Sequence, residues 1–370
     1  MRVALLAAAP FDKQGWGRYA RDLIATLEAH GVAITLIAST DAPADSGLPV
    51  SAYHRLLPPL VPAPRFTTAR HLWAIASVRQ AASACDLIHV IAEPYALEAG
   101  FGAKPLVVTA HGTYLPLTAR HPLLGWRYRH TYRRARILCV SSYTQKRVLE
   151  SVPGAHTEVI PNGVDVSRFQ TLPAPITKRG PLIVSVGQIK RRKGFHLLIR
   201  AMPSVHDLYP DAEAVIIGDT SADQDYVASL NAEIQRLNLQ GVVRLTGRVS
   251  DEQLRAYYAA ADIFALPALS SKTQFEGFGL VYLEASAAGL PVIGTRDCGA
   301  EDAIREGETG LLIPQDDSAA LTAAIDSLLR DPDLRTRMGA AGKVFAASQT
   351  WDQVGDRVAA AYQTVIARKK

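Results

Sequence analysis

Short apolar runs alternate with amphipathic segments along nearly the whole chain of 370 residues. The apolar runs have the length of strands buried on both faces, and the amphipathic segments have the spacing of helices with one buried side. This alternation is typical of parallel sheets covered by helices. The predicted strands are residues 3–8, 33–38, 87–92, 105–110, 137–141 and 158–161 in the first half, and residues 182–187, 214–218, 242–247, 262–267, 291–295 and 310–314 in the second.

The alternation is interrupted once, at residues 170–181, where Pro, Thr and Gly are frequent and neither period is present. Such composition predicts a linker. We therefore expect an α/β protein with two doubly wound, Rossmann-like domains in tandem, residues 1–169 and residues 182–349. Residues 350–370 have apolar positions on one helical face and no strand after them, so we predict a final helix that crosses back to the N-terminal domain.

The composition is that of a globular protein, with 20% charged and 48% hydrophobic residues. The three cysteines have no metal-binding spacing and indicate a reducing compartment. The apolar N-terminus leads directly into a helical pattern, which argues against a signal peptide. No apolar stretch approaches the roughly 20 residues of a membrane span. We expect a cytoplasmic protein, with peripheral attachment to the inner membrane face left open.

Positive charge is concentrated in the first half of the chain. Residues 47–149 have a balance of +10, whereas the whole chain has +5, so the remainder is negative. Within residues 115–137, arginines are interleaved with Trp, Tyr and Leu, a composition that suits an anionic membrane surface or an anionic acceptor. No nucleic-acid motif accompanies it, so nucleic acid is not expected. The arginines placed on this acceptor or membrane side are Arg127, Arg129, Arg133 and Arg134.

Two features follow predicted strands of the first half. Gly15-x-Gly17-x-x-Ala20, with Asp41 about 20 residues further on, matches a dinucleotide-binding fingerprint and makes an NAD-dependent oxidoreductase an alternative. The glycines begin several residues beyond the strand, which weakens the match. His111 directly follows the strand at 105–110, where a neutral imidazole can donate a hydrogen bond to a substrate hydroxyl.

In the second half, a run of four cations follows the strand at 182–187 and opens a helix. These cations, at the carboxyl end of a strand, predict an anion site suited to a diphosphate. The run consists of Lys190, Arg191, Arg192 and Lys193.

Two carboxylates, Glu276 and Glu284, flank a Gly-Phe-Gly loop in an otherwise apolar segment. Residues 280–288 are predicted to form a helix, whose N-terminal N–H groups and dipole favour an oxyanion. A buried carboxylate needs partners. If both face a cleft, sugar hydroxyls supply the donors. The loop residues are Gly277, Phe278 and Gly279.

The motifs AHGTY (110–114), IPNGVD (160–165), GQIKRRKG (187–194) and the pair Glu276 and Glu284 occur in this order along the chain. Together they resemble the retaining glycosyltransferases of family four, and the resemblance spans essentially the whole chain. It implies the GT-B fold, in which two Rossmann-like domains face a central cleft. It also implies transfer of a hexosyl unit from a nucleoside-diphosphate sugar to an acceptor hydroxyl. The base, the sugar, the acceptor (glycan, lipid or small molecule) and the oligomeric state stay open.

The resemblance also implies roles for single residues. Glu284 takes the ribose hydroxyls, Glu276 takes the hydroxyls of the transferred sugar, and the amides of Gly279 and Leu280 meet the distal phosphate. Lys193 neutralises the leaving diphosphate, so no metal and no other cofactor is expected. In the N-terminal domain, Gly15 and Gly17 match the family's glycine loop near the phosphates and acceptor, and His111 matches the histidine beside the sugar.

One position departs from the family pattern, because Gln188 stands where many members have a phosphate-binding arginine. We expect Arg192 or Arg191 to substitute. The departure keeps a non-catalytic nucleotide-sugar-binding protein as another alternative. Two Asp-x-Asp pairs, at residues 223–225 and 331–333, do not directly follow strands, which favours protein cations over a metal.

Overall fold

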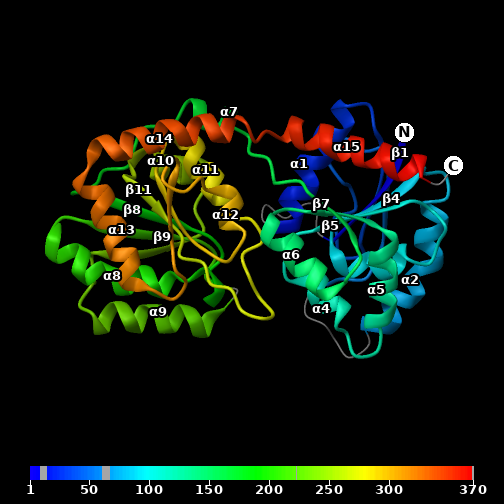
Figure 1. Cartoon of the computed structure of the whole chain (residues 1–370), viewed down its shortest axis with the longest axis horizontal. Coiled ribbons are helices and arrows are strands. Elements are labelled where there is room, and N and C mark those ends of the chain that lie inside the picture. Colours follow the sequence, from blue (N-terminus) through cyan, green and yellow to red (C-terminus); the bar gives the residue numbers. More distant parts are fainter. Residues whose placement is uncertain (9–14, 61–66, 222, 369–370) are drawn as a thin grey trace. The chain divides into compact units, whose positions relative to one another are not determined.

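The computed structural model describes residues 1–8, 15–60, 67–221 and 223–368. The chain forms two compact units: unit 1 contains Met1–Gly163 and Trp351–Lys370, and unit 2 contains Val164–Thr350. Each unit is built on a parallel sheet with helices on both faces (Figure 1), which confirms the predicted α/β class.

The sheet of unit 1 has seven strands among the described residues, in the order β3-β2-β1-β4-β5-β6-β7. Strand β1 (Arg2–Ala7), third in this order, contributes side chains to the cores on both faces of the sheet. Val3, Leu5 and Ala7 belong to the core with α1 and α15, whereas Ala4 and Leu6 belong to the core with α2, α3 and α5. The elements are β1 (Arg2–Ala7), α1 (Gly15–Ala29), β2 (Ala33–Ser39), β3 (Ala52–Leu57), α2 (Thr67–Ala81), β4 (Leu87–Val90), η1 (Glu93–Tyr95), α3 (Ala96–Ala99), β5 (Leu106–Ala110), α4 (Tyr114–Ala119), α5 (Gly125–Arg134), β6 (Arg136–Cys139), α6 (Ser142–Ser151), β7 (His156–Val159) and α15 (Trp351–Ala367).

The sheet of unit 2 has six strands among the described residues, in the order β10-β9-β8-β11-β12-β13, all parallel. The order reverses direction beside β8, which is where ligands bind in open parallel sheets. The elements are α7 (Ser167–Gln170), β8 (Leu182–Val186), η2 (Arg191–Lys193), α8 (Phe195–Leu208), β9 (Glu213–Ile217), α9 (Gln224–Arg236), β10 (Val243–Gly247), α10 (Asp251–Ala260), β11 (Ile263–Ala265), α11 (Leu280–Ala288), β12 (Val292–Thr295), α12 (Ala300–Ala303), β13 (Gly310–Ile313), α13 (Ser318–Arg330) and α14 (Pro332–Ala347).

One strand was not predicted. β3 lies at the edge of the unit 1 sheet, and of its residues only Leu57 is buried. An edge strand with one buried side chain lacks the continuous apolar run of the central strands, so its sequence reads as polar.

The predicted linker belongs to unit 2. Residues 171–181 contain no helix or strand, but unit 2 already begins at Val164. Ion pairs from Lys178 to Asp262 (2.5 Å) and from Arg179 to Glu213 (2.5 Å) attach this segment to the sheet of unit 2. Asp262 and Glu213 are far from this segment in the sequence, so no local pattern reveals these ion pairs. The composition alone therefore predicted a linker.

The C-terminal helix α15 packs on the sheet of unit 1 through Trp351, Val358 and Tyr362. Below it, the buried His89 is hydrogen-bonded through Nδ1 to the Tyr362 hydroxyl (2.6 Å) and through Nε2 to Thr109 Oγ1 (2.8 Å). Burial lowers the pKa of His89 to about 3. Both ring nitrogens are thus committed to neutral partners, and the imidazole links the last helix to the sheet. Among the described residues, no helix is both long and apolar enough to cross a membrane.

The buried His89 predicts a loss of stability in acid. The folded protein does not protonate this ring until about pH 3, whereas the unfolded chain takes up the proton below its ordinary value of 6.5. The contribution of His89 to the free energy of unfolding is therefore complete above about pH 6.5. Between about pH 6.5 and pH 3 this contribution falls by about 1.4 kcal/mol per pH unit. In urea unfolding from pH 7 to pH 4, the free energy of unfolding of His89→Gln should fall less steeply with falling pH than that of the wild-type protein, by about this slope. Equal slopes in the two proteins would contradict this account.

Candidate functional site

Three loops of unit 2 meet at the carboxyl ends of β8, β11 and β12. Leu269 N donates to Arg192 O (2.7 Å), and Gly299 N donates to Glu276 O (2.9 Å). A Cβ atom at Gly299 would lie 2.0 Å from the carbonyl oxygen of Gly277, so only glycine lets these two backbones approach this closely. The loops thus form one packed platform at the edge of the sheet where ligands are expected.

The platform contains a buried ion cluster. Lys193 Nζ (2.5 Å) and Arg192 Nη1 (2.8 Å) both donate to Oε2 of Glu276. Glu276 is 6% exposed and Lys193 is 7% exposed. Burial by itself raises the pKa of Glu276, but the two cations outweigh it and lower this pKa to about 2. Burial and the neighbouring Arg192 lower the pKa of Lys193, while Glu276 opposes that shift. Two cations face one carboxylate, so the cluster favours an additional anion.

The structure separates the two arginines proposed to replace the family arginine at Gln188. Arg192 reaches Glu276, whereas the exposed Arg191 lies with its Cζ 5.3 Å from the ring centroid of Tyr226. Of the two, Arg192 is therefore the arginine that lies in the cluster with Lys193.

Beside this cluster, α11 begins at Leu280 and ends at Ala288, as predicted. Gly279 caps it with φ 84°, and a Cβ there would lie 2.5 Å from the ring of Tyr282. The Tyr282 hydroxyl is held in place by Leu266 O (2.6 Å). The first N–H groups of a helix have no partner within it, and they favour an anion together with the helix dipole. The Gly-Phe-Gly loop thus leads into a helix N-terminus next to two cations.

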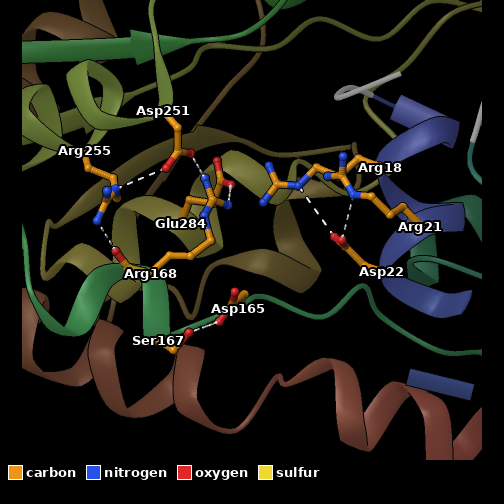
Figure 2. A network of polar contacts seen from close by, with 9 residues as sticks. All are labelled: Arg18, Arg21, Asp22, Asp165, Ser167, Arg168, Asp251, Arg255 and Glu284. Carbon is orange, nitrogen blue, oxygen red and sulfur yellow. Dashed lines mark hydrogen bonds and ion pairs between the residues drawn. The ribbon is translucent and has the colours of Figure 1, made fainter. Parts of the chain in front are cut away.

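Glu284 lies one turn inside α11 and is 1% exposed. Arg168 Nη1, from α7, lies 3.5 Å from its Oε1. Arg168 Nη2 also donates to Asp251 Oδ1, and Arg255 Nε lies 3.2 Å from the other oxygen of Asp251 (Figure 2). The two candidate glutamates of unit 2 therefore have separate cations.

In unit 1, His111 directly follows β5. Its backbone N–H donates to Oε1 of Glu93 (2.8 Å), and its ring is hydrogen-bonded to the backbone of Ile91. Nε2 has no hydrogen-bond partner within the described residues, so the bond to the Ile91 carbonyl uses Nδ1 and places the proton there. Burial lowers the pKa of His111 to about 3. The imidazole is neutral as expected, but its Nε2 is an acceptor, which corrects the expectation that the ring donates to a substrate.

Glu93 is fully buried and joins three parts of unit 1. Besides His111 N, its carboxyl group interacts with the backbone of Gly112 and the indole of Trp16, and its carbonyl accepts from the Tyr132 hydroxyl (3.1 Å). Burial raises the pKa of Glu93 to about 7 in spite of these donors. Glu93 therefore fixes the backbone that carries His111.

The predicted glycine loop is described only from Gly15 onward, since residues 9–14 lie outside the described parts. Gly15 (φ 56°) is the first residue of α1, and Gly17 is buried in its first turn. In a dinucleotide fold, the first glycine belongs to the tight turn after the strand. Here β1 ends at Ala7, well before Gly15, so the arrangement does not support the dinucleotide alternative.

The four arginines predicted for the acceptor or membrane side make contacts within unit 1. Arg127 Cζ lies 3.6 Å from the ring centroid of Phe101. The other three donate to carbonyl oxygens: Arg129 to Ala119 (2.5 Å), Arg133 to Pro153 (3.3 Å) and Arg134 to Gly102 (2.8 Å). These side chains therefore also stabilise the loops around α5.

The Asp-x-Asp pairs have a structural use. Asp223 accepts from Tyr226 N at the start of α9, and Asp331 accepts from Leu334 N at the start of α14. Helix caps of this kind are a common role of aspartate. Across the described ranges, no three His, Cys, Asp or Glu side chains gather in a way that could hold a metal ion.

Sequence reasoning missed Arg168 and Glu93. Each had a positional signal, because Glu93 directly follows the predicted strand 87–92 and Arg168 lies three residues beyond the IPNGVD motif. Their partners lie far away in the sequence, which a residue pattern does not reveal.

Comparison with known proteins gives the class of protein that the sequence motifs predict. Residues 14–168 match the model of Glycosyltransferase Family 4, and residues 170–345 match Glycosyl transferases group 1. A GDP-mannose-dependent alpha-(1-6)-phosphatidylinositol monomannoside mannosyltransferase of Mycolicibacterium smegmatis is 33% identical over 70% of each chain. A GDP-mannose-dependent monoacylated alpha-(1-6)-phosphatidylinositol monomannoside mannosyltransferase of Corynebacterium glutamicum is 31% identical over 92% of each chain.

Solved structures agree on the fold. Sucrose-phosphate synthase of Thermosynechococcus elongatus has a TM-score of 0.81 at 22% identity, with both chains covered completely. HepE of Anabaena, in complex with UDP, has a TM-score of 0.79 at 22% identity and covers 98% of this chain and 100% of its own. The fold and the matches define a nucleotide-sugar-dependent glycosyltransferase with the GT-B fold. The chain belongs to glycosyltransferase family 4.

Proposed function

We propose that unit 2 of this glycosyltransferase binds a nucleoside-diphosphate hexose and that the hexosyl unit is transferred with retention of configuration, without a metal ion. The observation that carries the proposal is the buried cluster of Glu276, Lys193 and Arg192 beside the N-terminus of α11. It combines cations and backbone donors for a diphosphate with a carboxylate for sugar hydroxyls.

The proposed roles follow from charge. As the bond between the sugar C1 and the diphosphate oxygen breaks, the electron pair goes to the diphosphate, and the growing negative charge is stabilised by Lys193, Arg192 and the α11 N–H groups. The acceptor oxygen forms the new bond to C1, and its proton passes to the departing diphosphate. Glu276 remains ionised, because its cations lower its pKa to about 2, and accepts hydrogen bonds from the sugar. His111 Nε2 is proposed to accept one more from a sugar hydroxyl.

The named relatives support a more specific donor and acceptor. Two of them are GDP-mannose-dependent enzymes that act on phosphatidylinositol mannosides. We therefore propose GDP-mannose as the donor and a hydroxyl of a phosphoinositol-containing glycolipid as the acceptor.

The two glutamates should respond differently to mutation. Glu284→Ala should weaken binding of both GDP and GDP-mannose, because each carries the ribose. Glu276→Ala should leave GDP binding unchanged or tighter, since Lys193 and Arg192 lose their carboxylate. It should nevertheless reduce mannose transfer about 100-fold. Calorimetric titration with GDP, together with turnover over a panel of GDP, UDP and ADP sugars, measures both effects.

The matched control is Glu252→Ala, which removes an exposed carboxylate from the first turn of α10 in the same unit. Equal loss of GDP affinity in Glu276→Ala and Glu284→Ala would contradict the assigned roles.

Transfer should not require a divalent metal. Because Lys193 and Arg192 supply the positive charge at the site, kcat should change less than about twofold after treatment with EDTA. Turnover before and after chelation, and after adding back Mg²⁺ or Mn²⁺, measures this. Loss of activity that Mg²⁺ or Mn²⁺ restores would refute metal independence.

Unit 1 also presents a surface suited to a lipid-linked acceptor. On and between α4 and α5, Leu123 is 72% exposed and Trp126 is 60% exposed, with Leu117 and the cations Arg120 and Arg133 also exposed. Exposed Trp and Leu beside arginines suit the interface of an anionic membrane. We propose that this surface, Leu117, Arg120, Leu123, Trp126 and Arg133, binds the membrane that contains the acceptor.

Co-sedimentation with liposomes tests this surface. The protein should bind vesicles of phosphatidylcholine with 30% phosphatidylinositol more than vesicles of phosphatidylcholine alone, and less at raised salt. The double variant Leu123→Ser, Trp126→Ser should lose most of the binding, whereas Val344→Ser, an exposed apolar residue of unit 2, should not. Equal binding to both kinds of vesicle would refute the proposal.

A further inference from the structure

Glu93 and His111 lie level with each other at one edge of the unit 1 sheet. Strands β4 and β5 are parallel neighbours, and residues 88–90 of β4 are paired with residues 106–108 of β5. Three residues beyond the last of these pairs, the same register places Glu93 beside His111, whose backbone N–H donates to Glu93 Oε1 (2.8 Å). The sheet therefore brings a carboxyl group to the backbone of the histidine that is the candidate sugar ligand.

The same carboxyl group also reaches the first turn of α1. Besides His111 N, the backbone of Gly112 and the indole of Trp16 interact with it. Trp16 lies between the two glycines of the predicted glycine loop, and its ring packs against Tyr114 with the centroids 4.5 Å apart. Glu93 thus links the beginning of α1 to the segment that follows β5.

The imidazole of His111 is held by three parts of unit 1. Its Nδ1–H donates to the backbone carbonyl of Ile91, two residues before Glu93. Tyr19 of α1 packs edge-on against the ring, with centroids 4.5 Å apart and planes at 83°, and Glu93 holds the backbone. Nε2 is buried and has no hydrogen-bond partner within the described residues. One acceptor position therefore remains on a ring whose orientation is set.

Glu93 lowers the stability of the fold at neutral pH, which points to a role in function. It is 0% exposed, and burial raises its pKa from the ordinary value of 4.5 to about 7, although several N–H groups interact with it. Among the described residues, the titratable groups near it supply no cation at neutral pH, since burial lowers the pKa of His111 to about 3 and raises those of Cys139 and Tyr132. Because the folded-state pKa is the higher one, this carboxyl group destabilises the fold progressively as the pH rises from about 4.5 to 7. Residues with such a cost are frequent at functional sites.

We propose that Glu93 is a positioning residue for hexosyl transfer: its carboxyl group joins Trp16 to the backbone of His111 and so holds His111 Nε2 in the orientation that accepts from a sugar hydroxyl. This inference rests on the proposed function, because it takes His111 as a ligand of the transferred sugar. It also gives Trp16 a role, which is to connect the glycine loop to the histidine.

A double-mutant cycle on the full chain tests this role, with hydrolysis of GDP-mannose to GDP and mannose as the readout. His111→Ala and Glu93→Ala should each lower kcat about tenfold, the effect of losing one hydrogen bond to the sugar. The double variant should be no slower than His111→Ala, because Glu93 acts through that ring. Binding of GDP, which carries no hexose, should be unchanged in calorimetric titration.

Two gentler variants separate the contacts of Glu93. Glu93→Gln retains an acceptor oxygen for His111 N and should keep kcat within about threefold of the wild-type value. In urea unfolding at pH 8 it should be at least as stable as the wild-type protein, since the buried charge is gone. Trp16→Phe removes the indole N–H but keeps an aromatic ring, and it tests the link even if Glu93→Ala does not fold. It should lower kcat about threefold, with no further loss when combined with His111→Ala.

The matched control is Glu98→Gln. It removes another buried carboxylate of unit 1, which is paired with His71 Nδ1 (2.5 Å). This change should leave kcat unaltered, both alone and in the His111→Ala background.

Losses that multiply would overturn the inference, because a double variant about tenfold slower than His111→Ala would show that Glu93 acts independently of the ring. Full activity in Glu93→Ala, or Glu93→Gln as slow as Glu93→Ala, would overturn it as well. If His111→Ala itself leaves kcat unchanged, the proposed role of His111 fails, and the inference that rests on it fails too. A loss in His111→Ala that multiplies with the loss in Glu93→Ala would overturn the inference alone.

Discussion

The candidate donor site of unit 2 depends on the ionic contact of Glu276 with Lys193 and Arg192. Charges this deeply buried are costly unless they are paired. The three groups come from two loops after β8 and β11, so their pairing holds these loops together. A third loop joins them because Gly299 has no side chain and allows its backbone to contact Gly277. The same contact that stabilises the loops leaves positive charge in excess, which an anionic ligand can neutralise.

Glu284, one turn inside α11, and Arg168 form a second pair of this kind. Each buried carboxylate is paired with its own cation before any ligand binds. Neither ion pair therefore has to form when a nucleotide sugar binds. Preorganised charges of this kind lower the cost of binding and of charge development during reaction. The helix α11 fixes the spacing between the two sites, since Gly279 caps its start and Tyr282 anchors its first turn.

The sequence predicted most of this architecture, because buried parallel strands and α11 have strong local patterns. It missed β3, where only Leu57 is buried, and it took residues 170–181 for a linker because the ion pairs of Lys178 and Arg179 are with distant residues. The residues of the ion cluster, Glu276, Lys193 and Arg192, could be predicted from their positions in the loops that follow strands. Arg168 could not, since its importance depends on Glu284, a partner far along the chain. The hydrogen-bonding role of His111 also required the structure, because the backbone of Ile91 decides which ring nitrogen carries the proton.

The two units use opposite electrostatics at their candidate sites. In unit 1, burial lowers the pKa of His111 to about 3 and raises the pKa of Glu93 to about 7, so the imidazole that follows β5 is uncharged at neutral pH. In unit 2, Glu276, Lys193 and Arg192 form a charged cluster at the equivalent edge. Neutral donors and acceptors suit hydroxyl groups, because they bind them without attracting counter-ions, whereas a diphosphate requires fixed cations. The chemistry of each edge therefore fits the proposed division of roles, with hydroxyl binding near His111 in unit 1 and diphosphate stabilisation in unit 2.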